Sequence, residues 1–413
     1  MCWSTHTESL RTTMNVLAVN CGSSTLKFQL SNLDGKRRLA SGVVERIGGP
    51  AHVRFSAEGG EELRDSGSIA DHEEAVLRVL RWLEQLGFTG RQGIDAVGHR
   101  VVHGGDRFVE PTLIDSEAIE AIEELEELAP LHNAPALSAI RAVRAALGPT
   151  APMVATFDTA FHRTMPPRSS QYPIPPEMAD KYRVRRYGFH GLAHRYMTER
   201  YAEITSTPVE RTKIVTLQLG AGCSATAVEG GRSVDTSMGF TPLEGLMMGT
   251  RSGDVDPSLA GFLARKEGVS ILEVEGWLNT RSGLLGVSGR SADMRELLEA
   301  EAAGHAPAAA AVEMFCYRVR KYIGAYLAVL EGADAIIFGG GIGENAPAVR
   351  ARVCTGMDWC GLALDPDRND AAVGSEARIS LDGSALQAYV IPVDEATIIV
   401  RDTVRRLHRL RRS

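Results

Sequence analysis

The sequence lacks several features that would assign it to a specialised class of protein. No apolar run approaches the ~20 residues that span a bilayer, which excludes helical membrane spans and a membrane partner. The six cysteines form no C-x-x-C pair and have no histidine at metal-ligand spacing. A disulfide framework is also not expected in a chain of 413 residues. We therefore expect reduced thiols and a cytoplasmic location.

An excess of positive charge is missing as well. The formal net charge is -7, which argues against a general nucleic-acid binder, because phosphate backbones favour clustered cations. The first residues, "MCWSTHTESLRTT", contain no basic stretch followed by an apolar one, so they do not resemble a secretory signal. We expect residues 1–13 to be either a disordered extension or an artefact of the choice of start codon. The composition, 44% hydrophobic and 23% charged, is that of a soluble globular protein long enough for two domains.

Apolar periodicity predicts alternating strands and helices. Strands are expected at 15–20, 26–31 and 40–55, the last one broken by Gly48-Gly49-Pro50. "EEAVLRVLRWLEQLG" predicts a helix that stops at Gly87, and "IDSEAIEAIEELEELAPLHN" predicts an acidic helix running to a Pro-Leu-His turn. "APMVATFDTAFH" predicts a buried strand ending in Asp158. This alternation indicates an α/β fold.

The second half of the chain repeats the theme of the first. "KIVTLQLGAGCSATAVEGG" has the strand, Gly-rich turn and strand outline of residues 15–30, which suggests an internal duplication. We place the domain boundary near residue 160, before a Pro- and Arg-rich stretch at 161–190 that is typical of the border of a functional cleft. The expected domains are 14–160, completed by a basic amphipathic helix at 396–413, and 161–395.

Glycine-rich turns at three strand ends indicate phosphate binding, because small residues let backbone amides approach an anion. These turns are "GSSTLK", "GAGCS" and "FGGGIGEN". None matches the P-loop or dinucleotide-binding patterns. Six further candidates, which follow predicted strands or lie in Gly/Pro turns, are Arg100, His132, Asp158, His190, Arg251 and Glu395. Arginines and histidines around an acid describe a pocket for anions, and phosphoryl transfer fits such a pocket.

Eight motifs together resemble the acetate kinase family over residues 14–404. They are "VNCGSSTLKF", "GHRVVHGG", "APLHN", "FDTAFHRTMP", "RRYGFHG", "VDTSMGFTPLEGLMMGTRSGDVDP", "SGLLGVSGRSADMR" and "GGIGEN". The resemblance implies two duplicated actin-like (ribonuclease H-like) domains with an interdomain active-site cleft. It also implies Mg²⁺-dependent, reversible, in-line transfer of the ATP γ-phosphoryl group to acetate, giving acetyl phosphate and ADP, by a homodimer.

The resemblance further implies roles for individual residues. Asp158 matches the catalytic acid and His190 the transition-state stabiliser, while Arg100 and Arg251 match the arginines for carboxylate and phosphoryl charge. His132 matches a further histidine of the site. The remaining roles are a methyl pocket at Val102, Leu131, Phe189 and Pro242; magnesium-site residues Asn20 and Glu395; and nucleotide-binding residues Lys27, Gln218, Leu219, Gly220, Ala221, Gly222, Asp293, Met294, Arg295, Gly341, Ile342, Gly343, Glu344 and Asn345.

The chain departs from the family pattern mainly in the second hairpin. The family reads His-Leu-Gly-Asn-Gly, whereas this chain has Gln218 and Ala221 at the two variant positions, so a side-chain amide expected near the phosphates is missing. Leu192, Ala193 and Ala134 are lesser departures. Three alternatives therefore stay open: a kinase for propionate or another short acid, a kinase with a different phosphoryl donor, and a non-catalytic nucleotide-binding regulator.

Overall fold

The computed structural model describes residues 14–32, 37–88, 93–127 and 130–412, and for residues 127, 130–132, 411 and 412 it describes the backbone alone. The extension expected at 1–13 lies outside the described residues. The chain divides into two compact units: unit 1 is Met1–Phe157 with Glu395–Ser413, and unit 2 is Asp158–Asp394. None of the described helices has the length and apolarity needed to cross a membrane.

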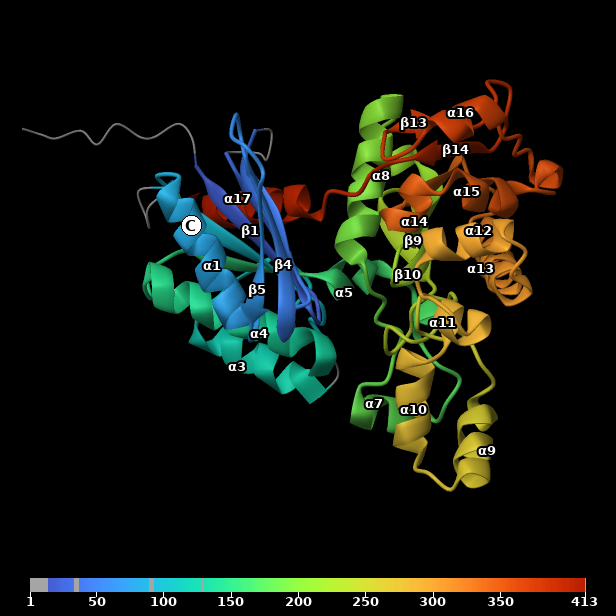
Figure 1. Ribbon diagram of the computed structural model, residues 1–413, viewed down its shortest axis with the longest axis horizontal. Coiled ribbons are helices and arrows are strands. Elements are labelled where there is room, and N and C mark those ends of the chain that lie inside the picture. Colours follow the sequence, from blue (N-terminus) through green and yellow to red (C-terminus); the bar gives the residue numbers. More distant parts are fainter. Residues whose placement is uncertain (1–13, 33–36, 89–92, 128–129, 413) are drawn as a thin grey trace, which may run out of the picture. The chain divides into compact units, whose positions relative to one another are not determined.

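Unit 1 is a sheet covered by helices, and the last helix of the chain belongs to it (Figure 1). Its strands are β1 (Val16–Cys21), β2 (Thr25–Ser31), β3 (Arg38–Glu45), β4 (Gly49–Ala57), β5 (Leu63–Ile69), β6 (Ala96–Val101), β7 (Thr112–Leu113) and β8 (Met153–Phe157). Its helices are α1 (His72–Gln85), α3 (Ser116–Glu124), the 3-10 turn η2 (Leu125–Glu127), α4 (Pro130–Leu147) and α17 (Glu395–Arg412).

The elements of unit 1 follow from local sequence. Asp71 and Asp115 accept backbone hydrogen bonds at the starts of α1 and α3, as N-cap residues do. The five residues of β8 are all buried, as expected of a central parallel strand between covering helices. Gly98 leaves room for α17, because a Cβ there would lie 2.4 Å from the Thr403 hydroxyl oxygen. Helix α17 thereby packs directly on β1, β6 and β8.

Unit 2 contains a second sheet and most of the helices. Its strands are β9 (Lys213–Leu219), β10 (Cys223–Glu229), β11 (Arg232–Thr236), β12 (Ala335–Gly339), β13 (Ala377–Arg378) and β14 (Gln387–Val390). Its α-helices are α5 (Asp158–Phe161), α6 (Pro167–Ser170), α7 (Pro176–Tyr182), α8 (Gly191–Thr205), α9 (Pro257–Glu267), α10 (Ile271–Thr280), α11 (Gly283–Ser288), α12 (Met294–Ala302), α13 (Ala306–Val329), α14 (Gly340–Asn345), α15 (Pro347–Cys354) and α16 (Pro366–Ala371). Its 3-10 turns are η3 (His162–Thr164), η4 (Val209–Arg211) and η5 (Asp358–Cys360).

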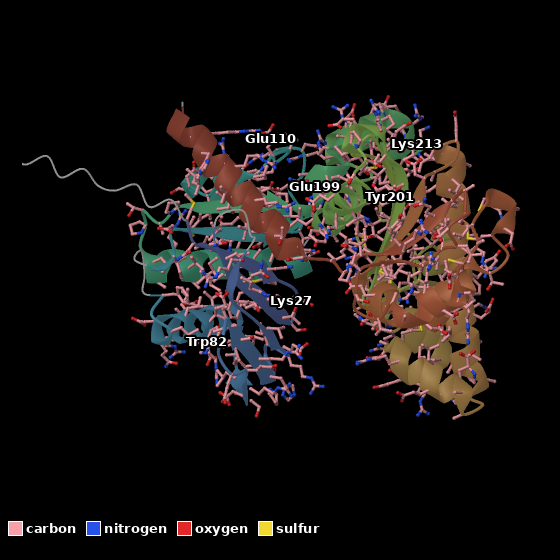
Figure 2. All side chains as sticks on the ribbon, turned by 90° about the horizontal axis from the view of Figure 1, so that it is seen from above. Lys27, Trp82, Glu110, Glu199, Tyr201 and Lys213 are labelled. Carbon is pink, nitrogen blue, oxygen red and sulfur yellow. The ribbon has the colours of Figure 1, made fainter. Side chains whose placement is uncertain are left out.

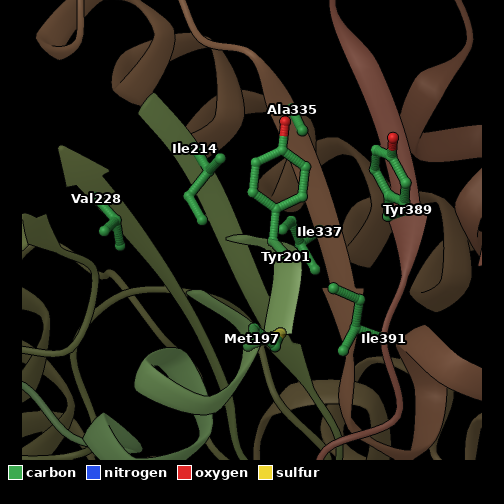
Figure 3. Close-up of a cluster of buried hydrophobic side chains, with 8 residues drawn as sticks. All are labelled: Met197, Tyr201, Ile214, Val228, Ala335, Ile337, Tyr389 and Ile391. Carbon is green, nitrogen blue, oxygen red and sulfur yellow. The ribbon is translucent and has the colours of Figure 1, made fainter. Parts of the chain in front are cut away.

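Helix α8 packs on the sheet of unit 2 through a buried apolar cluster (Figure 3). Met197 and Tyr201 of the helix meet strand residues such as Ile214 and Ile337. The rings of Tyr201 and Tyr389 pack edge to face with centroids 5.4 Å apart. This cluster fixes the helix whose first turn carries the histidines described below.

The two sheets share one strand order, which confirms the predicted α/β class and its internal duplication. The order β3-β2-β1-β6-β8 in unit 1 corresponds to β11-β10-β9-β12-β14 in unit 2. The strands β3-β2-β1 and β11-β10-β9 are antiparallel to their neighbours. The strands β1-β6-β8 and β9-β12-β14 are parallel to theirs. The hairpins β1–β2 and β9–β10 are therefore equivalent elements of the two halves.

One local prediction holds with a shifted position and another was wrong. The segment 40–55 is broken as expected, into β3 and β4, but the break lies at 46–48, because Gly49 and Pro50 already belong to β4. The predicted Pro-Leu-His turn is instead the beginning of α4, which starts at Pro130. Proline at the first position of a helix loses no hydrogen bond, because the first four amides have no partner within the helix.

Candidate active site

In unit 1, one row of the sheet brings candidate residues together. Asn20 pairs with Lys27 across the β1–β2 hairpin and with Arg100 across β1–β6, so all three side chains share one face. Arg100 Nη1 donates to Asn20 Oδ1 at 2.9 Å, and Asn20 Nδ2 donates to Glu395 Oε2 at 2.6 Å. Lys27 is exposed on the same hairpin (Figure 2).

These contacts decide how the predicted metal residues could act. Magnesium in proteins usually takes one or two carboxylates and fills its shell with waters and substrate phosphates. The half-buried Glu395 fits that role. Asn20 Oδ1 is engaged by Arg100, so the Asn20 side chain is suited to orienting Glu395. Among the described residues, no group of three or more His, Cys, Asp or Glu side chains forms a metal cage.

The loop after β6 is held by a buried amide. Asn133 Oδ1 accepts from the His103 amide at 3.0 Å, and Asn133 Nδ2 donates to the His103 carbonyl at 3.0 Å. This double contact joins the first turn of α4 to the loop that follows the buried Val102. Leu131 and His132 lie in that first turn, but their side chains are outside the described part of the structure.

In unit 2, Asp158 and His190 lie where two short segments meet. Asp158 follows β8 directly, is completely buried, and accepts the His190 amide at Oδ2 with a distance of 3.2 Å. His190 has a left-handed backbone with φ of 55°, which is uncommon for a residue with a side chain and often marks functional sites. Gly191 permits this approach, because a Cβ there would lie 1.8 Å from the Asp158 carbonyl oxygen.

Gly222 of the second hairpin lies beside two candidate residues. A Cβ at Gly222 would be 3.3 Å from His190 Nε2 and 3.6 Å from Arg251 Nη1, so both groups approach the same point of the hairpin. Arg251 Nη1 also donates to the Pro242 carbonyl at 3.1 Å and contacts Met248 Sδ at 3.6 Å. Burial lowers the pKa of Arg251 from its ordinary value. No carboxylate pairs with Arg251 in the part of the chain that the structure describes.

The residues of unit 2 that the sequence predicts for a methyl pocket are held by neighbouring polar groups. Phe189 is buried, and its carbonyl accepts from His162 Nε2 at 3.0 Å. The segment at Pro242 is anchored by the Tyr172 hydroxyl, which donates to Glu244 and accepts the Phe240 amide at 2.7 Å. Gly239 lets this pair pack against the backbone, because a Cβ there would lie 1.6 Å from Glu244 Oε2.

The nucleotide residues predicted from the second hairpin lie in two settings. Gln218 is on β9, opposite Ser224 and beside Gly339, on the face that also carries the buried Thr216. Leu219 is buried at the end of β9, and Gly220 to Gly222 form the turn, with Ala221 exposed. The Ala221 carbonyl accepts the Gly249 amide at 3.0 Å, which joins the turn to the segment before Arg251.

The "GGGIGEN" turn forms helix α14, and its acidic residue faces the protein. Glu344 Oε1 accepts the amides of Gly340 at 2.8 Å and Val393 at 3.0 Å, so the carboxylate caps the start of α14. Asn345 Nδ2 donates to the Gly341 carbonyl at 3.0 Å. Ile342 is half-buried and Gly343 is buried in this short helix. The Glu344 carboxylate therefore already supplies a negative charge to the N-terminus of α14, where helix dipoles favour one.

The third predicted nucleotide stretch caps another helix. Asp293 accepts the amide of Arg295 at the start of α12 and forms an ion pair with the same residue at 2.8 Å. Hydrogen bonding to Arg295 lowers the pKa of Asp293. Met294 is buried, while Arg295 is exposed.

Sequence reasoning missed the polar neighbours of His190. His194 Nε2 and Ser224 Oγ form a hydrogen bond of 2.7 Å, and His190 Nδ1 lies 2.9 Å from the same oxygen. The available signal was the spacing of the two histidines in "FHGLAHR", because residues four apart share one face of a helix. His162 of "FDTAFHR" was also missed, and burial lowers its pKa to about 4.

Comparison with known proteins supports one family. Residues 15–401 match the model of the acetokinase family. The acetate kinase of Solibacter usitatus is 49% identical over 406 residues, covering 95% of this chain and 98% of that protein. The crystal structure of Porphyromonas gingivalis acetate kinase matches with a TM-score of 0.88 at 40% identity, over 95% of this chain and 100% of that one.

A second solved structure is equally similar in fold. A propionate kinase from Francisella tularensis matches with a TM-score of 0.88 at 37% identity, covering 94% of this chain and 98% of that one. Both structures agree with the duplicated α/β architecture found here. Because the family model and its relatives extend over nearly the whole sequence, the chain belongs to the acetokinase family.

Proposed function

We propose that the chain is a phosphotransferase that moves the γ-phosphoryl group of ATP to acetate and catalyses the reverse reaction. The observation that carries the proposal is Arg251, a half-buried guanidinium without a described acidic partner, next to His190 at the Gly222 turn. An anionic group placed there would pair with this partly desolvated cation. The family and the names of its relatives supply the substrates.

The proposed reaction requires cations that stabilise the phosphoryl oxygens and side chains that hold the two substrates in line. An acetate oxygen attacks the γ-phosphorus while the bond to the β-γ bridging oxygen breaks, so the phosphoryl group passes to acetate and ADP leaves. Arg251 and the His190 ring would bind the equatorial oxygens, and Arg100 would offer its planar fork to an anion. Asp158 would hold His190 through the backbone contact seen at 3.2 Å. Magnesium, held by Glu395, would neutralise the nucleotide phosphates.

We place the protein in the cytoplasm, which the five described cysteines support because all of them are free thiols. We also propose a homodimer. Large apolar side chains exposed on unit 2 support it, because such surface is often covered by a partner. Examples are Phe262, Ile271, Leu272, Tyr317 and Trp359.

Acid selectivity is the first test of this function. We expect acetate to be the best substrate and propionate to be slower by about tenfold, because one methylene is worth ~1–3 kcal/mol in a small apolar pocket. Of the residues predicted for that pocket, Val102 of unit 1 and Phe189 of unit 2 are buried, and Pro242 of unit 2 is half-buried. The measurement is hydroxylamine trapping of acyl phosphate with ATP, Mg²⁺ and a panel of acids. Faster turnover of butyrate than of acetate would contradict the proposed pocket, and failure of every acid would favour the regulator.

The second hairpin gives a separate prediction about the phosphoryl donor. We expect Ala221→Asn to raise kcat/KM for ATP by about tenfold or more, since a hydrogen bond to a charged group is worth ~1.5–3 kcal/mol. The exposed position of Ala221 leaves room for the amide. Gln218→Ala is the control, because Gln218 lies on the adjacent strand and could supply the same group. If Ala221→Asn leaves kcat/KM unchanged or lower, the hairpin is adapted to alanine, and pyrophosphate should be tried as donor.

A further inference from the structure

Polar side chains in unit 2 form a continuous hydrogen-bonded chain that ends at His190. His190 Nδ1 lies 2.9 Å from Ser224 Oγ, and the same oxygen lies 2.7 Å from His194 Nε2. His194 Nδ1 in turn lies 2.8 Å from Thr216 Oγ1. Ser224, His194 and Thr216 have no exposed surface. Both ring nitrogens of His194 are therefore committed to hydroxyl groups inside the protein.

The hydrogen bonds from Thr216 through His194 and Ser224 to His190 can be oriented in only two ways. Ser224 has one hydroxyl proton, and its oxygen has no third hydrogen-bond partner among the described residues, so it donates to one imidazole and accepts from the other. Burial, together with the nearby His162 and His190, holds the pKa of His194 well below its usual range. The His194 ring is therefore neutral and carries one proton. The position of that proton, on Nδ1 or on Nε2, fixes the orientation of the Ser224 hydroxyl. The Ser224 hydroxyl in turn determines whether His190 Nδ1 carries a proton.

Thr216 decides between the two directions. Its hydroxyl is 2.8 Å from His194 Nδ1 and 3.5 Å from the Thr226 carbonyl, at the outer limit for a hydrogen bond. The single proton of this hydroxyl therefore goes to His194 Nδ1. His194 then donates from Nε2 to Ser224 Oγ, and Ser224 donates to His190 Nδ1. In a neutral His190 ring the proton must consequently be on Nε2.

We propose that Ser224, His194 and Thr216 are positioning residues that hold His190 in the neutral tautomer with its proton on Nε2. Nε2 is the nitrogen that lies beside Gly222, 3.3 Å from the position of a Cβ there. From this place a neutral N–H donates a hydrogen bond to a phosphoryl oxygen, while Arg251 supplies the positive charge. The catalytic part of this inference rests on the proposed function, but the tautomer itself does not.

The equivalent position in unit 1 supports a specialised role for Ser224. In the duplicated sheets, Asn20 corresponds to Gln218, and their partners across the hairpin are Lys27 and Ser224. Unit 1 thus has a charged, exposed side chain at the position where unit 2 has a buried hydroxyl. The small serine side chain at this position leaves room for the two imidazole rings that Ser224 joins.

The tautomer is tested directly by NMR of the full chain labelled with ¹⁵N-histidine and without substrates. The His190 ring is identified by the signal lost in His190→Gln. We expect a protonated Nε2 and an unprotonated Nδ1. A proton on Nδ1, protons on both nitrogens, or an even mixture of tautomers would overturn the proposal. Because no substrate is present, this result stands even if the chain fails to phosphorylate acetate.

Kinetics test the positioning role. We expect Ser224→Ala to lower kcat for acetyl phosphate formation by about 10–10²-fold, with KM for ATP and acetate within about threefold. Ser224→Thr, which keeps the hydroxyl, should recover most of this loss. Thr216→Val keeps the shape of the side chain and should also lower kcat, so it decides the matter if Ser224→Ala does not fold. A kcat within about twofold of wild type in the folded variants would overturn the proposal.

Ser233 offers a matched control in the same unit. Its buried hydroxyl contacts His162 Nδ1 at 2.9 Å, so Ser233→Ala also removes one buried serine–histidine hydrogen bond. His162 Nε2 keeps its own bond to the Phe189 carbonyl in this variant, so we expect a similar loss of thermal stability with kcat within about twofold of wild type. If Ser233→Ala lowers kcat as much as Ser224→Ala does, the effect is general destabilisation and the positioning role is wrong.

Discussion

Replacing Arg251 by alanine is expected to lower kcat by at least about 10²-fold, because it removes a preorganised cation from the point where phosphoryl charge develops. The guanidinium contacts the Pro242 carbonyl and Met248 Sδ and has no described acidic partner, so little structural pairing is lost. The melting temperature should therefore change by only a few degrees. Arg251→Lys should give an intermediate kcat, because lysine keeps the charge without the planar fork.

The control for this prediction is an arginine outside the candidate site. Arg200 forms exposed ion pairs with Glu203 and Glu376, and exposed pairs contribute little to stability. Arg200→Ala should keep kcat within about twofold of wild type. Near-native kinetics in Arg251→Ala would mean that the phosphoryl group is not stabilised at the Gly222 turn.

Gly191→Ala is expected to have the largest structural effect, with a loss of ~3–5 kcal/mol in the free energy of unfolding and at least about 10²-fold in kcat. The added Cβ would lie 1.8 Å from the Asp158 carbonyl oxygen and 2.9 Å from Phe161 Cβ. Rotation of a side chain cannot relieve a clash with backbone. Helix α8 would have to move away from α5, which would separate the His190 amide from Asp158. Chemical denaturation and steady-state kinetics are the measurements.

A glycine in an open helical position provides the comparison. Gly324 lies in α13, and a Cβ there would meet no atom within 4 Å. Gly324→Ala should stabilise the protein by ~0.5–1 kcal/mol, because alanine favours the helix more than glycine does. Wild-type stability and turnover in Gly191→Ala would show that the contact between α5 and α8 does not hold the site together.

Much of the fold could be predicted from the sequence because burial leaves a local pattern. The apolar run before Asp158 is a fully buried strand, and the "FGGGIGEN" turn follows the end of a strand as expected, here the buried β12, and forms helix α14. Strand β5 escaped prediction because most of its residues are exposed and only Ile69 is buried. An edge strand of this kind has no apolar alternation that would distinguish it from a loop.

The candidate site was only partly predictable, for a physical reason. The residue types of the motifs indicated Arg100, Asp158, His190 and Arg251, but their partners come from distant parts of the chain. Ser224 lies 34 residues after His190 along the chain, and Glu395 lies 375 residues after Asn20. Glu344 is predicted at the nucleotide from its motif, but the motif did not indicate that its carboxylate accepts two backbone amides. Local sequence gives the type of a side chain, whereas its direction depends on tertiary contacts.

The central claim is phosphoryl transfer from ATP to a carboxylate, and ³¹P NMR of the reaction tests it most directly. The full chain is incubated with ATP, Mg²⁺ and acetate, and the phosphorus-containing products are followed over time. We expect acetyl phosphate and ADP to appear in equal amounts, and added acetyl phosphate and ADP to regenerate ATP. Consumption of ATP to ADP and inorganic phosphate without acetyl phosphate, or no consumption of ATP at all, would contradict it.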